Sequence, residues 1–234
     1  MTRSELLDGV ARDLAARTSE LGLRVGVNGV DAAGKTTFAD ELAECMTALG
    51  CPVVRASVDD FARPRNERYA RGRYSPEGYY RDTTDLEALS ARLLQPLGPG
   101  GSRRYVTRVF DVWDDRPVEE PERTAPEGAV LLLDGIFLLR SELRGLLDYA
   151  IFLDVDFGTC LERALVRDSG RVGVDEAETR AIYARRYFPA QSLYFDNARP
   201  LERADLVIDN RDLAAPRVTR ERAGRRGGSG SPAQ

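Results

Sequence analysis

The stretch 29-GVDAAGKTT-37 matches the pattern G-x-x-x-x-G-K-S/T, the phosphate-binding P-loop. The apolar residues 23–27 before it predict a β-strand, and residues 36–49 after it predict a helix. Strand, glycine-rich turn and helix are the context that a P-loop needs, so a chance match is disfavoured. The stretch therefore predicts an α/β fold of the P-loop NTPase type, a three-layer sandwich with a mainly parallel central sheet and a small lid.

The chemistry of the loop depends on its residue types. Glycines let backbone N–H groups turn onto phosphate oxygens, and the helix N-terminus adds positive potential. Lys35 is the only lysine among 34 basic residues. A P-loop requires a compact charge on a flexible stem at this position, which a planar guanidinium does not supply. The residues expected to bind ATP phosphates are Gly29, Asp31, Ala32, Ala33, Gly34, Lys35, Thr36 and Thr37.

Composition limits the other classes. A chain of 234 residues can form one sizeable core, or one core with a small lid. The net charge of −4 gives no basic surface for nucleic acid, so we expect no nucleic-acid partner. The three cysteines lack C-x-x-C spacing, and no long apolar run suggests a signal peptide or a membrane span. We therefore expect a cytoplasmic protein without membrane association, and a homo-oligomer stays open.

The sequence contains no histidine. Histidine-based metal sites, Ser-His pairs and Cys-His pairs are therefore excluded, and so is the usual general base. Any proton abstraction has to fall to a carboxylate, a tyrosine or water.

Three segments are expected along the chain. Residues 1–22 are predicted to form an N-terminal helix packed on the core, because Leu7, Val10, Leu14 and Leu21 recur at helical spacing. Residues 23–210 form the P-loop domain, with its last strand at 204–209. Residues 211–234 form a C-terminal segment that is largely a disordered tail, since Gly, Ser, Arg and Pro without periodicity follow residue 223.

Two carboxylates follow a predicted strand over residues 51–57. Asp59 and Asp60 lie at its carboxyl end, the edge where α/β sheets bind ligands. An aspartate there can accept a proton from an attacking hydroxyl or help to hold Mg²⁺, and Asp59 is favoured over Asp60. The alternative is that the pair caps a turn.

A second buried strand ends in an acid. Residues 129–135 contain four strongly apolar residues followed by Asp134, which is the Walker B pattern of a parallel strand with a carboxylate at its carboxyl end. Asp134 is expected to reach Mg²⁺ directly or through water, together with Thr36.

Arginines gather in two places. Residues 63–73 carry five of them and are predicted to form a loop or hairpin, either binding a substrate anion or facing solvent. Arg163 and Arg167 lie four apart on a predicted helix over 159–168, and Arg171 follows. These three are expected to form a lid over the phosphates; a surface ion-pair face is the alternative. A further helix over 175–187 is predicted to kink or end at Pro189.

The ordered set of motifs resembles the uridine kinase, phosphoribulokinase and bacterial pantothenate kinase group of P-loop kinases. The resemblance covers about residues 23–209. It depends on motifs beyond the P-loop, which alone is shared by many superfamilies. These motifs are Asp59-Asp60-Phe61, Val109-Phe110-Asp111, Leu133-Asp134-Gly135-Ile136, and Arg163 with Arg167-Asp168.

The resemblance implies roles for individual residues. Asp59 matches the aspartate that accepts the proton of a ribose 5′-hydroxyl and lies near Mg²⁺. Asp134 matches a Mg²⁺-binding acid that is usually glutamate, and Arg167 matches a phosphate-clamping lid arginine. Phe110-Asp111 matches a Y-D motif that flanks the base. Pyrimidine nucleoside kinases of the group also use a histidine to read the base, and this chain has none.

The sequence thus predicts an ATP-dependent kinase that uses Mg²⁺ and phosphorylates a hydroxyl of a small molecule, with a nucleoside as the leading acceptor. Pantothenate, a sugar or a specialised metabolite is the alternative acceptor. A nucleotide-dependent switch is a rival function, but a GTPase needs an N-K-x-D motif, and the only lysine is Lys35. The residues expected at the acceptor are Asp82, Tyr79, Phe110 and Asp111.

Overall fold

A six-stranded sheet forms the centre of the protein, which was analysed as a computed structural model describing residues 1–168 and 175–222. Five strands are parallel, and the edge strand β10 is antiparallel to β9. In spatial order the strands are β2 (Val53–Ser57), β7 (Val130–Gly135), β1 (Leu23–Gly29), β8 (Tyr149–Asp154), β9 (Leu206–Asp209) and β10 (Arg217–Glu221).

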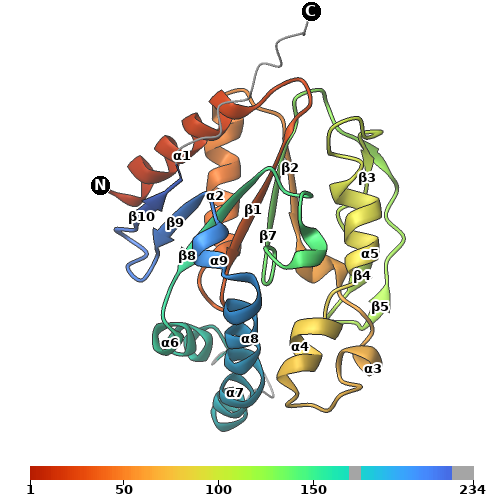
Figure 1. Cartoon of the computed structure of the whole chain (residues 1–234), viewed down its shortest axis with the longest axis vertical. Helices are drawn as coiled ribbons and strands as arrows, with labels where there is room; N and C mark the ends of the chain where they lie inside the picture. Colours follow the sequence, from red (N-terminus) through yellow and green to blue (C-terminus); the bar gives the residue numbers. More distant parts are fainter. Residues whose placement is uncertain (169–174, 223–234) are drawn as a thin grey trace, which may run out of the picture.

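Helices cover both faces of the sheet (Figure 1). Val130 and Leu132 of β7 pack into a core with α1 (Arg3–Arg17) and α2 (Lys35–Ala48). Leu131 and Leu133 point to the other face and pack against α5 (Leu86–Leu89) and the π-helical turn η2 (Ser90–Leu94). Because successive residues of one strand serve two cores, residues 130–133 are all apolar, as a doubly covered parallel strand requires. The predicted three-layer α/β fold is confirmed.

The carboxyl ends of the parallel strands meet at one edge, where helices gather in the lower part of Figure 1. Asp134 lies opposite Val27 on one side and Ser57 on the other. The P-loop, the end of β2 and the end of β7 are therefore neighbours. The surrounding elements are η1 (Val58–Phe61), α3 (Arg65–Arg68), α4 (Pro76–Asp82), α6 (Phe157–Asp168), α7 (Glu176–Ile182), the π-helical turn η4 (Tyr183–Tyr187) and α8 (Phe188–Ala198). The short helix α9 (Pro200–Arg203) precedes β9 and lies toward the amino end of that strand.

Short elements complete the chain. Residues 104–111 contain two two-residue strands, each of which pairs with a strand of the loop that follows. These elements are β3 (Arg104–Tyr105), β4 (Phe110–Asp111), β5 (Arg116–Pro117), β6 (Arg123–Thr124) and the 3₁₀ turn η3 (Ser141–Leu143). Of the helices that the structure describes, none is long and apolar enough to cross a membrane.

The structure corrects several expectations. The first helix ends at Arg17 with Thr18 as its C-cap, so Leu21 lies beyond it with 63% of its surface exposed. Residues 63–73 form the short helix α3 and turns, not a hairpin. The helix does not end at Pro189, which lies in the first turn of α8. Proline is tolerated there because the backbone N–H groups of a first turn have no partner within the helix. The strand over 206–209 is not the last, since β10 follows it. The tail predicted from residue 223 lies outside the described residues.

Candidate active site

A cleft of about 340 Å³ opens at the carboxyl ends of the strands, above the P-loop. It brings together predicted site residues from four separate parts of the sequence. The lining residues are Asp31, Ala32, Gly34, Lys35, Thr36, Thr37, Asp59, Asp134, Gly135, Ile136, Arg163, Arg167 and Leu213.

The P-loop is held in shape by its own backbone and by one buried amide. Gly34 has a φ of +89° and Ala32 a φ of +61°, the left-handed conformation in which a loop can curl its amides inward. The Nδ2 group of Asn210, which is fully buried, donates to the carbonyl of Ala33 at 2.8 Å. The Lys35 Nζ donates to the Val30 carbonyl at 2.8 Å across the loop. These contacts hold the loop in shape.

Asp134 lies on the floor of the cleft and contacts the start of α2. Its Oδ2 accepts a hydrogen bond from the Thr36 hydroxyl at 2.8 Å, and its side chain is almost fully buried. Arg55 of β2 lies 2.7 Å from Oδ1 of the same carboxylate, and 2.8 Å from Asp40. Because an isolated buried carboxylate is costly, the contact with Arg55 offsets the cost of burying Asp134.

Asp59 and Asp60 point to different places. Asp59 lines the cleft, whereas Asp60 forms an ion pair with Arg108 at 3.1 Å outside it. The 3₁₀ turn η1 that carries them packs against β7, where Gly135 leaves no space for a Cβ beside Val58. This close approach places Asp59 next to Asp134.

The electrostatics of Asp59 are unusual for an aspartate. Water reaches it from the cleft, but the surrounding protein still desolvates its carboxyl, and this is the main reason that its pKa is raised to about 6. Lys35 acts in the opposite direction, while Asp134, Asp31 and Asp60 raise the pKa further. A carboxylate with this pKa is suited to accept a proton near neutral pH.

The donors present fit the Mg²⁺ that accompanies a nucleotide. Within the described residues, no three acidic or cysteine side chains form a metal cage of their own. Magnesium does not need one, because it keeps waters and binds substrate phosphates with one or two carboxylates. The Thr36 hydroxyl and the Asp134 carboxylate are already adjacent, and Asp59 lines the same cleft.

Two of the three predicted lid arginines line the cleft. Arg163 donates to the carbonyls of Asn210 and Arg211, both at 2.8 Å, and so ties α6 to the segment after β9. Arg167 makes two hydrogen bonds of 2.9 Å to Asp168, and these raise its pKa. Both guanidinium groups therefore lie beside the P-loop. Arg171 lies outside the described residues.

Asp31 connects the P-loop to the helices beyond it. The Tyr79 hydroxyl donates to its Oδ1 at 2.7 Å, and the Gln191 amide donates to its Oδ2 at 3.0 Å. The Tyr79 ring lies 4.4 Å from that of Tyr187 and 5.7 Å from that of Phe137, measured between centroids. This carboxylate therefore anchors α4 and α8 to the loop, whereas the sequence predicted only a phosphate contact.

None of the four predicted acceptor residues lines the P-loop cleft, and Tyr79 contacts it only through its hydrogen bond to Asp31. Asp82 forms an ion pair with Arg71 at 2.7 Å. Phe110 is buried, with 4% of its surface exposed. Asp111 caps a turn by accepting the amides of residues 113 and 114, and it pairs with Arg108 at 2.7 Å.

The arginine-rich run over residues 63–73 is mostly engaged with protein groups. Arg68 pairs with Asp115 at 3.1 Å, and Arg73 pairs with Glu178 of α7 at 2.6 Å. The almost fully buried Arg186 donates to three backbone carbonyls of the run and stacks over Tyr69 at 4.4 Å. The run therefore docks the segment containing α3 against η4 and α7.

Three residues of the site were missed by sequence reasoning. Arg55 pairs with Asp134, and Gln191 donates to Asp31. Asn210 donates to the carbonyl of Ala33 in the P-loop. The only signal for Arg55 was a charge inside an apolar strand, and Asn210 directly follows the strand β9. No local pattern marked Gln191.

Comparisons with known proteins agree with this geometry. A family model described as the phosphoribulokinase / uridine kinase family matches residues 24–213. A uridine kinase of Schizosaccharomyces pombe is 29% identical over 189 residues, which are 79% of this chain and 39% of that protein. A uridine kinase of Leuconostoc citreum is 23% identical over 188 residues, 80% of this chain and 86% of that protein.

Among solved structures, a Bacillus stearothermophilus protein described as a "possible uridine kinase" has a TM-score of 0.66. The alignment covers 86% of this chain and 96% of that chain at 24% identity. This likeness shows the fold alone. The chain thus spans less than half the length of the S. pombe relative, but nearly all of the Bacillus structure.

Proposed function

Because the chain belongs to the phosphoribulokinase / uridine kinase family, we propose that it is an ATP-dependent kinase acting on a hydroxyl group of a small molecule. The observation that carries the proposal is the cleft in which Lys35, Asp59 and Asp134 meet at the P-loop. A switch protein has no need for a strand-end carboxylate with a raised pKa beside the phosphate site.

The cleft residues supply each part of a direct transfer. The acceptor oxygen forms a bond to the γ-phosphorus, the bond from that phosphorus to the β–γ bridging oxygen breaks, and ADP leaves. Asp59 accepts the proton of the acceptor hydroxyl. Lys35 and the P-loop amides bind the β- and γ-phosphates, and Arg163 and Arg167 stabilise the charge that develops on them. No covalent enzyme intermediate is required.

Thr36 and Asp134, with Asp59 nearby, would hold Mg²⁺. When bound, the ion neutralises phosphate charge and orients the nucleotide. The protein's own contribution is to pair Asp134 with Arg55 and to hold the P-loop through Asn210.

The acceptor proposed first is a nucleoside, phosphorylated at its 5′-hydroxyl. The uridine kinases among the relatives support it. A second acceptor class is favoured by one observation. Asp111, the counterpart of the family's base-flanking motif, is already engaged by Arg108 and two amides. A sugar, pantothenate or another hydroxyl-bearing metabolite is therefore the alternative.

An acceptor panel tests the proposal. ADP release from Mg·ATP is measured with uridine, cytidine, adenosine, pantothenate, ribulose 5-phosphate and simple sugars, and Lys35→Ala is the blank. We expect acceptor-dependent ADP release that the blank lacks. Turnover with a nucleoside supports the first acceptor class, and turnover only with another compound supports the second. Tight ATP binding without acceptor-dependent turnover across the panel would favour the switch.

A further inference from the structure

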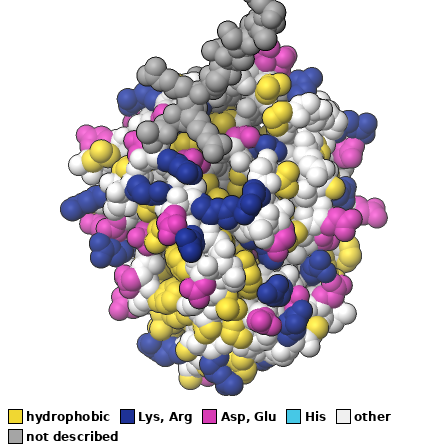
Figure 2. Space-filling model, in the orientation of Figure 1, with side chains coloured by type: hydrophobic (Ala, Val, Ile, Leu, Met, Phe, Trp, Pro, Cys, Tyr) yellow, Lys and Arg dark blue, Asp and Glu magenta, His cyan; other side chains and the backbone are white. Residues whose placement is uncertain are grey.

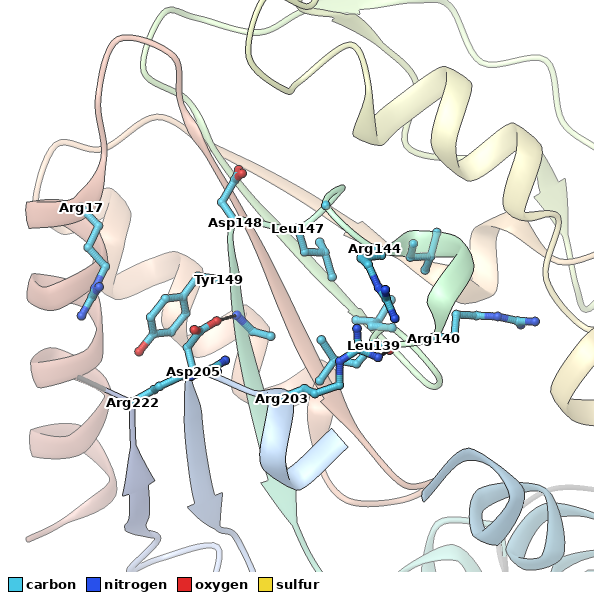
Figure 3. Close-up of a pocket in the computed structure, with 14 residues that line it drawn as sticks. Arg17, Leu139, Arg140, Arg144, Leu147, Asp148, Tyr149, Arg203, Asp205 and Arg222 are labelled. Atoms are coloured by element: carbon cyan, nitrogen blue, oxygen red, sulfur yellow. Dashed lines mark hydrogen bonds between the residues drawn. The ribbon is translucent and has the colours of Figure 1, made fainter. Parts of the chain in front are cut away.

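A second cavity lies at the opposite edge of the sheet, where β8 and β9 begin (Figure 3). Its volume is about 440 Å³, larger than that of the P-loop cleft. Its walls are the end of α1, the connection between β7 and β8, the end of α9 and the last described residue, Arg222. Figure 2 shows basic side chains gathered on the middle of this face of the molecule. None of the proposed kinase residues lines this cavity.

The arginines of this cavity, which we call the amino-end pocket, differ in their partners. Arg17 is neutralised by Asp13 at 2.8 Å. Arg140 pairs with Glu142 at 2.6 Å, and its side chain extends away from the other arginines in Figure 3. The other three have no carboxylate within ion-pair distance among residues 1–168 and 175–222. These three are Arg144, Arg203 and Arg222.

The acids of the pocket do not balance these three charges. Asp148 is already matched by Arg24, through two contacts of 2.8 Å and one of 2.9 Å. Asp205 accepts the Ala150 amide at 2.9 Å and forms no ion pair within the described parts of the chain. Three guanidinium groups against one carboxylate leave an excess of two positive charges. In a protein with a net charge of −4, this excess marks a site for a dianion.

A phosphomonoester matches the excess, because it carries about −1.5 to −2 charges at pH 7. Guanidinium groups bind phosphate oxygens in a bidentate manner, and three arginines from different segments line this one cavity. The remaining wall offers the Tyr149 ring together with Leu143 and Leu147, so the pocket can also accept an organic group. We propose that the amino-end pocket binds a small phosphorylated metabolite through Arg144, Arg203 and Arg222.

A chain of hydrogen bonds joins this pocket to the P-loop. Arg203 donates to the Leu139 carbonyl at 3.1 Å, and the Leu139 amide donates to the Tyr194 hydroxyl at 2.9 Å. The Asn28 side chain donates to the same hydroxyl at 2.5 Å and accepts the Gly29 amide at 2.9 Å. Gly29 is the first residue of the P-loop. If a bound phosphate draws Arg203 away from the Leu139 carbonyl, the change can pass through Leu139, Tyr194 and Asn28 to Gly29 of the P-loop.

The proposal thus includes an effector role: the bound phosphorylated metabolite changes nucleotide affinity. The binding site stands without the proposed kinase function, whereas the effector role rests on it.

Calorimetry tests the binding. Inorganic phosphate and ribose 5-phosphate are titrated into protein saturated with Mg²⁺ and a non-hydrolysable ATP analogue, so that the P-loop is filled. The variant is Arg144→Ser with Arg222→Ser, and the matched control is Arg12→Ser with Arg92→Ser, at exposed positions outside the pocket. We expect the first pair to weaken binding roughly a hundredfold, since each lost charge-assisted hydrogen bond weakens it about tenfold. The control pair should bind as the wild type does.

Two results would overturn the site: no binding to the analogue-saturated wild type, or equal weakening in both double variants. The effector role is tested by the affinity of the ATP analogue with and without saturating ribose 5-phosphate. We expect a change of at least about fivefold in the wild type and none in Arg144→Ser with Arg222→Ser. An unchanged affinity in the wild type would rule out the effector role. These measurements need no phosphate acceptor, so a silent acceptor panel would count against the kinase proposal alone.

Discussion

The two ends of the central sheet carry different polar sites. In the P-loop cleft, at the carboxyl ends of the strands, cations and carboxylates are mixed; in the amino-end pocket, three arginines face one unmatched carboxylate. The charges of the cleft are Lys35, Arg163 and Arg167 with Asp31, Asp59 and Asp134.

The difference has a physical meaning. A site that moves a phosphoryl group and a proton needs both signs of charge, because the charge is redistributed during the reaction. A site with an excess of positive charge is suited to hold an anion. The cleft is therefore suited to chemistry and the amino-end pocket to binding. Substitutions in the cleft should therefore reduce turnover, whereas substitutions in the amino-end pocket should change ligand binding.

The largest effect is expected for Lys35→Arg, which keeps the charge and changes its shape. A planar guanidinium cannot occupy the position of the ammonium group inside the loop. Turnover should fall by about 10³- to 10⁵-fold, the scale on which one charge-stabilising group acts in phosphoryl transfer. Steady-state kinetics with the acceptor found in the panel provides the measurement. If Lys35→Arg kept the wild-type turnover, the proposed contact between the Lys35 ammonium group and the phosphates would be wrong.

Arg167→Ala should have the next largest effect. The guanidinium group lines the cleft and is expected to act on the charge of the transition state, so kcat should fall by about 10²- to 10³-fold while ATP affinity changes little. Separate measurements of kcat and nucleotide affinity provide the check. The matched control is Arg180→Ala, an exposed arginine of α7 that pairs with Glu176. Near-full turnover in Arg167→Ala would show that Arg167 does not stabilise the phosphates during the transfer.

Arg55→Met tests the support of the cleft. The substitution leaves the buried carboxylate of Asp134 without its cation, so the free energy of unfolding should fall by roughly 1–3 kcal/mol. Denaturant unfolding measures the change. Asp40→Asn breaks only the exposed contact of the same arginine and should cost less than about 1 kcal/mol. Equal losses in both variants would mean that Arg55 does not stabilise Asp134.

The smallest effect is expected in the amino-end pocket. Arg144→Ser with Arg222→Ser should leave the free energy of unfolding within about 0.5 kcal/mol of the wild type, because neither side chain pairs with a carboxylate in the described structure. Thermal unfolding without phosphate provides the measurement. A marked loss of stability would show that these arginines support the fold and are not free to bind a ligand.

The fold and part of the cleft could be predicted from the sequence because they depend on short patterns. A P-loop between strand and helix, and acids at strand ends, place Lys35, Asp59 and Asp134 at one sheet edge by topology alone. The choice between Asp59 and Asp60 could not be predicted with the same certainty. It depends on which way each side chain points in a 3₁₀ turn packed against Gly135.

Other features depend on contacts between distant parts of the chain. Gln191 reaches Asp31 across 160 positions, and Asn210 reaches Ala33 across 177. The edge strand β10 has largely exposed residues and no apolar alternation that would predict it. The amino-end pocket combines four separated segments, none of which carries a motif.

The most direct test of the central claim compares two neighbouring aspartates. Asp59→Asn and Asp60→Asn make the same chemical change one residue apart, inside and outside the cleft. Single-turnover transfer from γ-labelled ATP is measured for each variant with nucleotide bound. We predict that Asp59→Asn binds ATP and slows the transfer by about 10²- to 10⁴-fold, while Asp60→Asn remains close to the wild type. Fast transfer by Asp59→Asn would contradict the assignment of Asp59 as the base.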